Sequence, residues 1–510
     1  MKNRISSIWP GIVLLLAAIF VSCKDDWDSH FDRSENLPDE NLWEIIRSEA
    51  SLASFVKVVE ATGYDSLLTS TQTYTVWAPV NDALSGIDMN DKEELLRIVN
   101  NHIARYSNST AMPVDESVVM LNGKRLMYAS DGTLTFGSAT LLQKDRLASN
   151  GIFHTVSEVI PYSYNLYEYA QTHSDYSKLY DFISSFNEKV VSEELSTSLE
   201  IVYIDYNPLL ESIYGIGYVQ DEDSTYTMLL PDNGAWDKAY EQIAPYFKAP
   251  THNGQEYADS LQKVQASLAI VNSLVYRKLV EEPFAQYDSL VSTTGTVTHN
   301  VPSLFAGTTF IKGSNGNIYT TSALNYEPLD TWNPEIVIEC EDEDGRTVNG
   351  SSTAFVRTVS VGDNFTDVSN NSYLEVTGSD QASVSFQIPN ILSGKYEVYV
   401  DFVPPIVDGE EFETERAQVE FELEYMNTNG RTKTSDGKRA TVTGTEKVRA
   451  TAFTGVTMPV ANYYDNLWWS ETSHTAADAK VTTTLTVYAE KTSKNVAKFR
   501  IDKIRFVPVN

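Results

Sequence analysis

Cysteine is nearly absent from this chain, which has two cysteines in 510 residues, Cys23 and Cys340. Two cysteines cannot build a disulfide framework, so stability must come from hydrophobic cores. Basic residues are also scarce: 38 Lys and Arg stand against 70 Asp and Glu, which gives a net charge of −32. So acidic a surface repels phosphate backbones and bare anionic membranes, and we therefore expect no nucleic-acid partner.

Long apolar runs are missing as well, apart from one near the start of the chain. That run extends from Ile12 to Val21 and is too short to span a bilayer. Lys2 and Arg4 precede it, and Cys23 follows it after a single serine. A basic start, an apolar run and a small-residue end are the pattern of a secretory signal peptide with its cleavage site.

The segment around the first cysteine resembles a bacterial lipoprotein lipobox. Phe20 stands where most lipoboxes have Leu, a departure seen more often in Bacteroidota, and residues 24–26 are similar to the surface-export signal of that phylum. The resemblance implies that residues 1–22 are removed and that Cys23 carries lipid. Several acyl chains, at about 0.8 kcal/mol per buried CH₂, anchor a protein stably. We therefore expect a surface-exposed protein of the outer membrane, with residues 23–39 as an acidic spacer.

The next part of the chain has helical periodicity first and strand periodicity afterwards. Apolar residues at helical spacing predict helices within 41–63 and 91–106. A buried strand is expected at 74–78, and from 117 to 160 the apolar period becomes two. Helices followed by strands indicate an α+β domain rather than βαβ units.

Three short segments then recur in the same order, which indicates a tandem duplication. The pairs are 41–44 with 165–168, 74–84 with 226–236, and 149–155 with 314–320. We call residues 40–162 the first repeat and residues 163–331 the second repeat. The spacing between partners grows along the chain, so we expect insertions in the second repeat near 190–220 and 248–262.

Two motifs in the first repeat resemble the signature blocks of fasciclin (FAS1) domains. They are TVWAPVNDAL at 75–84 and SNGIFHTV at 149–156. The match is good over the first repeat and partial over the second, where Gly234 and Tyr319 replace the motif's Asp and His. The resemblance implies two tandem α+β fasciclin-like domains, the second one divergent. The family consists of binding and adhesion modules, so it implies no catalysis.

From residue 334 onward the chain has seven or eight short alternating segments and almost no helical period. This pattern predicts a β-sandwich. The Glu-x-Glu at 339–341, the Gly-Lys-Tyr at 394–396 and the closing segment 501–506 resemble the galactose-binding-like jelly roll of many carbohydrate-binding modules. The resemblance implies that residues 334–510 form an all-β jelly-roll sandwich with a carbohydrate ligand.

In the modules that this sandwich resembles, a structural calcium is commonly held by acids of the first strand and an Asp near the last strand. Glu339, Glu341 and Asp502 occupy those places. Carboxylates from separate segments are ligands that calcium prefers. The alternative is an acidic face exposed to solvent, and no other cofactor is expected.

A cluster of aromatic residues between two expected strands is the candidate ligand site. Sugar rings stack on aromatic planes, while amides and carboxylates bind sugar hydroxyls. Asn462, Asp465 and Asn466 lie among these aromatic residues, and we therefore expect a glycan site here. The alternative is that the large aromatic side chains fill the core of the sandwich. The four candidates are Tyr463, Tyr464, Trp468 and Trp469.

No catalytic motif stands out. His102 and His154 lie in phase with apolar neighbours, and we expect both to be hydrogen-bonded core residues rather than metal ligands or bases. The chain has no zinc spacing, no nucleophile elbow, no phosphate-binding loop and no dinucleotide fingerprint. We therefore expect no enzymatic activity.

These observations together favour a non-catalytic cell-surface lipoprotein that binds extracellular glycans as an accessory to polysaccharide capture. The fasciclin resemblance supports this reading, because bacterial surface members of that family often accompany glycan-capture machinery. The alternative is an adhesin that binds host or neighbouring-cell proteins through the fasciclin-like domains. A third class, an enzyme that acts on glycans through the sandwich, has no residue pattern in its favour.

Overall fold

The computed structural model divides into two compact units, one ending at Ser163 and the other beginning at Tyr164. Within the described residues, no helix is both long enough and apolar enough to cross a membrane. The signal peptide and Cys23 lie outside the described residues. Those are 38–112, 116–196, 200–212, 215–359, 367–404, 416–443, 446–462 and 482–509.

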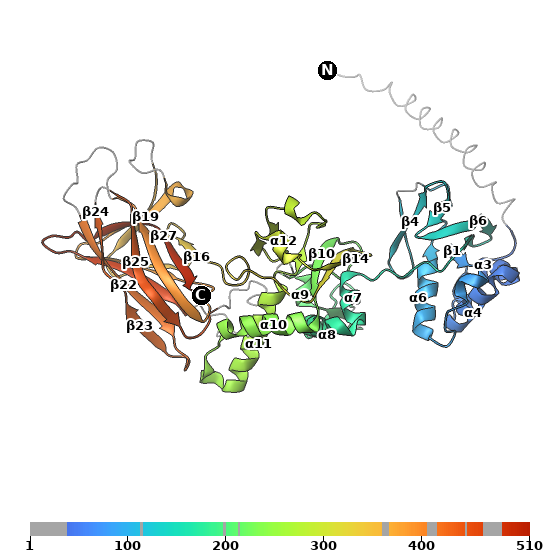
Figure 1. Cartoon of the computed structure of the whole chain (residues 1–510), viewed down its shortest axis with the longest axis horizontal. Helices are drawn as coiled ribbons and strands as arrows, with labels where there is room; N and C mark the ends of the chain where they lie inside the picture. The colour runs from blue at the N-terminus through green and yellow to red at the C-terminus, as the bar shows by residue number, and fades with distance from the viewer. Residues whose placement is uncertain are drawn as a thin grey trace, which may run out of the picture. The chain divides into compact units, whose positions relative to one another are not determined.

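The first unit packs helices against one sheet of seven strands in the order β2-β1-β7-β6-β5-β4-β3 (Figure 1). Its helices are α3 (Leu42–Ser48), α4 (Ala53–Thr62), α5 (Asp65–Leu68) and α6 (Lys92–His102), with short 3-10 turns η2 (Ala50–Leu52) and η3 (Asn81–Leu84). Its strands are β1 (Tyr74–Pro79), β2 (Ile103–Arg105), β3 (Ser117–Val119), β4 (Arg125–Ser130), β5 (Leu134–Phe136), β6 (Ala139–Ala148) and β7 (Gly151–Val156). Helices do precede most strands, as the periodicity predicts.

The parallel pair β1 and β7 lies at the centre of this unit, and every residue of both strands is buried. Asn150, directly before β7, accepts a hydrogen bond from Leu42 N (2.8 Å) and donates to the carbonyls of Leu68 (2.8 Å) and Ser70 (2.7 Å). Gly151 then has φ = 153°, and a Cβ atom there would lie 1.9 Å from the Tyr74 carbonyl oxygen. Only glycine allows this approach of the two strands.

The second repeat is the first part of the second unit. Like the first repeat, it packs helices against a sheet, here ordered β11-β10-β15-β14. Its helices are α7 (Leu166–Thr172), α8 (Ser177–Ser184), α9 (Pro208–Glu211), α10 (Asn233–Ile243), α11 (Gln255–Val271) and α12 (Val301–Leu304). Its strands are β8 (Glu188–Val191), β9 (Tyr203–Tyr206), β10 (Tyr226–Pro231), β11 (Val275–Tyr276), β12 (Leu290–Val291), β13 (Val297–Thr298), β14 (Thr309–Gly313) and β15 (Gly316–Thr321).

The second repeat has the same polar contacts as the first. Asn315 accepts a hydrogen bond from Leu166 N (3.0 Å) and donates to the carbonyls of Val219 (2.9 Å) and Asp221 (3.0 Å). Gly316 has φ = 154°, and a Cβ atom there would again lie 1.9 Å from a carbonyl oxygen of the parallel partner strand, here β10. Both repeats also start a helix with an Asn–Glu capping box. The repeated sequence segments therefore build the same frame twice.

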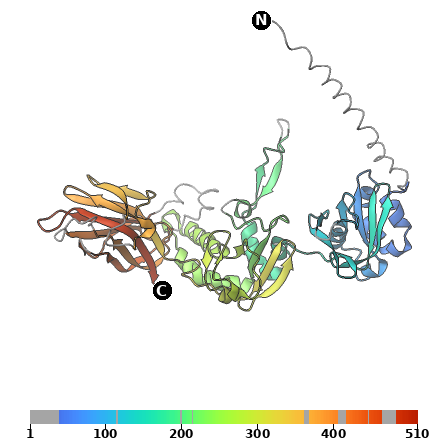
Figure 2. The same ribbon diagram turned by 90° about the horizontal axis from the view of Figure 1, so that it is seen from above.

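The second repeat differs from the first in the two expected insertions and also outside them, where α10 stands in place of η3 and the sheet has four strands instead of seven. The hairpin β8–β9 and helix α9 lie in the first expected insertion, and Figure 2 shows the hairpin standing out from the helices of its own repeat. The second expected insertion contains the start of α11, which has 17 residues, whereas the corresponding α6 has 11. The parallel strand pair is thus kept, whereas the helices and the number of sheet strands differ.

The described residues between 336 and 509 form two sheets. One is ordered β18-β19-β27-β21-β25, with β16 also paired to β27, and the other is ordered β17-β20-β26-β22-β23, with β24 also paired to β22. One apolar core unites the two sheets and includes Cys340. The strands are β16 (Ile336–Glu339), β17 (Arg346–Val348), β18 (Thr353–Thr358), β19 (Ser372–Thr377), β20 (Gln381–Gln387), β21 (Gly394–Phe402), β22 (Arg416–Met426), β23 (Thr432–Asp436), β24 (Ala440–Thr443), β25 (Val448–Met458), β26 (Thr484–Glu490) and β27 (Lys498–Val509).

The described residues thus contain more strands than the seven or eight that the alternation predicted. The unexpected strand β25 is rich in Thr, Ala and Gly, and it therefore has a weak apolar alternation. Backbone hydrogen bonds also join the second repeat to the two sheets within their unit. Thr251 N donates to the Thr428 carbonyl (2.8 Å), and Ser393 N donates to the Tyr246 carbonyl (2.7 Å).

We predict that Gly151→Ala destabilises the first unit by roughly 3–5 kcal/mol, because the new methyl group would collide with the Tyr74 carbonyl. Gly123→Ala is the matched control: Gly123 also has a positive φ (83°), but no atom lies within 4 Å of its Cβ position. The control should cost about 1 kcal/mol. Equal losses for the two variants in urea denaturation would contradict the central role of this strand pair.

Candidate functional site

The predicted aromatic site cannot be placed. Tyr463, Tyr464, Trp468 and Trp469 all lie outside the described residues. Their assignment as ligand-binding residues stays a prediction from the sequence.

The three predicted metal ligands lie around one interruption in the sheet. Strand β27 pairs with β19 through residues 498–501 and with β16 through residues 503–506. Asp502 is the residue between these two partners, at a register shift against β21. Glu339 ends β16, and Glu341 follows it closely. The change of partner strand thus brings acids from opposite ends of the sandwich sequence to one place.

The loop before β19 contacts all three acids. Ser369 N donates to Asp502 Oδ1 (3.0 Å), and Ser369 Oγ donates to Glu339 Oε1 (2.8 Å). Asn370 Nδ2 donates to Glu341 Oε1 (3.1 Å). The other carboxylate oxygens of the two glutamates, both named Oε2, are buried and have no hydrogen-bond partner. Burial, with the charge of Glu339 adding to it, raises the pKa of the Asp502 carboxyl to about 6.

Two buried carboxylate oxygens without partners fit a site for a hard cation, because calcium prefers oxygen ligands and an unpaired buried charge is costly. The acids do not meet directly, since Ser369 and Asn370 bridge them. Across the described segments, no three His, Cys, Asp or Glu side chains converge as a ready metal cage. A cation here would be held by Glu339, Glu341 and Asp502 and would take over contacts now made by the loop.

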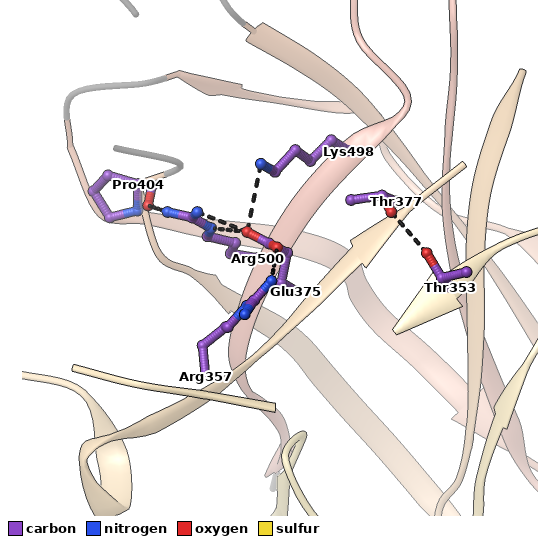
Figure 3. A network of polar contacts seen from close by, with 7 residues as sticks. All are labelled: Thr353, Arg357, Glu375, Thr377, Pro404, Lys498 and Arg500. Atoms are coloured by element: carbon purple, nitrogen blue, oxygen red, sulfur yellow. Dashed lines mark hydrogen bonds and ion pairs between the residues drawn. The ribbon is translucent and has the colours of Figure 1, made fainter. Parts of the chain in front are cut away.

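A second polar cluster lies on the outer face of the same sheet (Figure 3). Glu375 on β19 receives two hydrogen bonds at its carboxylate from neighbouring strands, from Arg500 Nε on β27 (2.8 Å) and from Arg357 Nη2 on β18 (3.0 Å). Lys498 Nζ lies 3.4 Å from the same carboxylate. Arg500 also donates to the Pro404 carbonyl (3.0 Å). One buried carboxylate therefore faces three cations.

The cations determine the charge state of Glu375. Burial by itself would raise the pKa of this carboxyl, but the hydrogen bonds and charges of Arg500, Arg357 and Lys498 outweigh burial and hold it below its usual value. Arg500 is buried with the carboxylate, whereas Arg357 and Lys498 remain partly exposed. The cluster thus fixes three strands together and still offers cationic groups to solvent.

An exposed aromatic ring adjoins this cluster. Phe355 on β18 is 50% exposed, and the Arg357 guanidinium lies 5.2 Å from its ring centroid. Thr353, on the same strand, shares a 2.8 Å hydrogen bond with Thr377 on β19. The sequence reasoning missed this surface. The sequence pattern that could have revealed this surface is the alternation of Thr353, Phe355 and Arg357, which places all three side chains on one face of a strand.

The two candidate histidines are core residues, as expected. His102 Nε2 accepts a hydrogen bond from Ile160 N (3.0 Å), and its Nδ1 lies 2.7 Å from the Ile98 carbonyl oxygen. His154 Nδ1 accepts from Asp145 N (3.2 Å). Burial lowers the pKa of His102 to about 4 and also lowers the pKa of His154. Both imidazoles are therefore neutral and structural.

Comparison with known proteins identifies the first repeat. Residues 50–162 match the family model described as "Fasciclin domain". This segment is a fasciclin domain. Transforming growth factor-beta-induced protein ig-h3 of Oryctolagus cuniculus is 24% identical over 223 residues, which is 42% of this chain and 28% of that protein. Protein sll1483 of Synechocystis is 26% identical over 127 residues, 23% of this chain and 71% of that protein. The chain thus spans little more than a quarter of the rabbit relative.

Solved structures similar to this chain include a FAS1 domain pair from the insect cell adhesion molecule Fasciclin I. It has 16% identity and a TM-score of 0.20, over 55% of this chain and 98% of that one. Others are carbohydrate-binding modules from Paenibacillus barcinonensis. A CBM35 has 14% identity and a TM-score of 0.20 over 34% and 98% of the two chains. A CBM22-1 xylan-binding domain has 16% identity and a TM-score of 0.22 over 34% and 94%.

We predict that the fasciclin domain loses stability as the pH falls from 6.5 toward 4. The folded-state pKa of His102 and His154 is lowered, so the folded state resists protonation while the unfolded state binds protons in this range. Thermal midpoints measured between pH 7 and pH 4 should fall, and His102→Gln should reduce the fall. His299→Gln, at an exposed position, is the control. A pH dependence unchanged by His102→Gln would contradict this assignment.

Proposed function

We propose that this protein is a non-catalytic lipoprotein that is anchored through Cys23 in the outer membrane of a bacterium of the Bacteroidota, faces outward and binds extracellular glycans. In this proposal residues 163–331 are a second, divergent fasciclin-like domain, and residues 334–510 are a carbohydrate-binding jelly roll. The signal-peptide and lipobox patterns support the location. The fasciclin domain, from a family of binding modules, supports a role in binding rather than catalysis.

One observation carries the glycan assignment: the outer face of β18 and β19 combines an exposed ring with cations and hydroxyl groups. Phe355 offers a flat apolar face, and the partly exposed Arg357 and Lys498 offer donors beside it. Sugars have apolar C–H faces and polar edges, so they match surfaces of this kind. The aromatic cluster Tyr463, Tyr464, Trp468 and Trp469 is a further candidate glycan site in this proposal, and it rests on the sequence alone.

We also propose a structural calcium at Glu339, Glu341 and Asp502. The unpartnered oxygens of the two glutamates support it, because a divalent cation would compensate buried negative charge. In the bound state the cation would link β16, β27 and the loop before β19. Its role would be to hold these three segments together.

Calcium should therefore raise the thermal midpoint of the full-length mature protein. A ligand at 100 times its Kd stabilises the folded state by about 2.7 kcal/mol. Glu341→Gln should abolish most of the shift, whereas Asp342→Asn, at an exposed neighbouring position, should retain it. Calorimetry with calcium or with EDTA measures the effect. An identical midpoint in both conditions would refute the calcium site.

The glycan assignment predicts specific binding of the mature protein to at least one polysaccharide on an array, with no turnover of the bound glycan. Phe355→Ala and the pair Trp468→Ala and Trp469→Ala should each weaken binding about tenfold or more, which corresponds to about 1.4 kcal/mol. Phe310→Ala, at an exposed Phe on β14, is the control. If the Phe355 and Trp variants all bind like the parent, the proposed surface is wrong, and release of oligosaccharides would contradict the non-catalytic role.

A second candidate function, adhesion to proteins, is favoured by the hairpin β8–β9. It exposes several large apolar side chains, and patches of this kind mark protein–protein contacts. Binding to surface proteins and to none of the polysaccharides, lost on Ile201→Asp, would favour this alternative. The exposed residues are Val191, Leu195, Ile201, Tyr203 and Ile204.

A further inference from the structure

A groove of about 610 Å³ lies within the second repeat, between helices α8, α10 and α11. These helices are drawn in green and labelled in Figure 1. The groove's volume is within the range of pockets that bind small ligands. It involves none of the residues assigned above to the glycan surface or to the calcium site.

Two walls of this groove come from helices that the first repeat has only in shorter form. After β1 the first repeat has η3, a turn of four residues, whereas after β10 the second repeat has α10, a helix of eleven residues. The helix that leads into the next strand grows from 11 residues in α6 to 17 in α11. The frame was kept while the helical layer was extended. The groove is therefore lined by two helices, α10 and α11, that have shorter counterparts in the first repeat.

The apolar part of the groove is mainly aromatic. Phe182, Trp236 and Tyr240 line it, and Val264 is its single aliphatic lining residue among those described. The rings of Phe182 and Trp236 lie 5.7 Å apart and are tilted by 45°. Phe182 and Tyr240 are partly exposed, whereas Trp236 is only 7% exposed. Exposed aromatic rings suit the flat C–H surfaces of sugars better than branched aliphatic side chains do.

The polar part of the groove has balanced charge. Lys178 and Asp237 form an ion pair, and Asp181 and Lys263 are exposed beside them. Two cations and two anions leave no net charge to attract an ion. Serine hydroxyls add neutral donors and acceptors, including that of Ser267, a groove residue that is only 2% exposed.

We propose that this groove binds a neutral oligosaccharide. Pyranose C–H faces would stack on Phe182, Trp236 and Tyr240, and the sugar hydroxyls would exchange hydrogen bonds with the charged and serine side chains. An acidic or basic sugar would gain nothing from a groove without net charge. An apolar peptide helix would cover the polar groups without pairing them, which is costly. The site goes beyond the proposed glycan surface of the sandwich, and two sites on one tethered chain would give avidity.

The test is hydrogen exchange by mass spectrometry on the full-length mature protein, with and without neutral cello-, xylo- and manno-oligosaccharides. We expect slower exchange in residues 177–184, 233–243 and 255–271 with at least one of them. Slower exchange confined to the sandwich strands would support the proposed function and refute the groove. No change in these three helices with any neutral oligosaccharide, or a change only with polygalacturonate or with an apolar peptide, would also overturn the proposal.

Substitutions of groove residues test whether the slower hydrogen exchange comes from binding in the groove. Tyr240→Ala and Lys263→Ala should each weaken binding of the protecting oligosaccharide tenfold or more. Lys238→Ala, on the same helix as Tyr240 but not among the groove residues, should bind like the parent. If Tyr240→Ala melts early, Ser260→Trp replaces it, because this change fills the groove from an exposed position. Parental affinity in both Lys263→Ala and the groove-filling variant would overturn the proposal.

Discussion

A buried asparagine side chain before a parallel strand is the contact on which both repeats depend. Asn150 ties the first helix and the loop after α5 to β7, and Asn315 makes the same kinds of contact before β15. Each amide pairs with buried backbone groups, so its loss would leave such groups without this partner away from water. The glycine that follows each asparagine lets the parallel strands approach closely. These polar contacts add to the apolar core that the helices and the sheet share in each repeat.

This shared frame limits where the two repeats differ. The repeats differ in the hairpin β8–β9, in the longer helices α10 and α11, and in the segment before β14, where the pair β12–β13 and helix α12 stand in place of β3–β5. None of these differences interrupts the parallel strand pair. The surfaces proposed to bind ligands therefore lie outside the frame that the two repeats share. In the sandwich, β27 changes its partner strand from β19 to β16 at Asp502. This change brings Asp502 close to Glu339 and Glu341. Rigid strands thus position polar groups that the sequence keeps far apart.

The local parts of this architecture could be predicted from the sequence. The strand from Tyr74 depends on neighbouring residues and forms as expected, and the Asn–Glu capping boxes likewise need only residues three positions apart. The recurrence of the Ser-Asn-Gly segment was visible in the sequence, but the contacts of its buried asparagine were not predicted. The Glu375–Arg500 pair joins residues 125 apart, and its register depends on strand pairing that alternation does not specify. The groove likewise needs three helices from separate segments. Periodicity gives each helix a face but does not say which faces meet.

The central claim is that the same asparagine contact stabilises both repeats. Its most direct test is the free energy of unfolding of Asn150→Ala and Asn315→Ala, measured by urea denaturation of the full-length protein with probes in each unit. The account predicts that each substitution destabilises its own unit by about 2–3 kcal/mol and leaves the other unit unchanged. A large loss for Asn150→Ala together with none for Asn315→Ala would contradict it, because the second repeat would then be held together by other contacts.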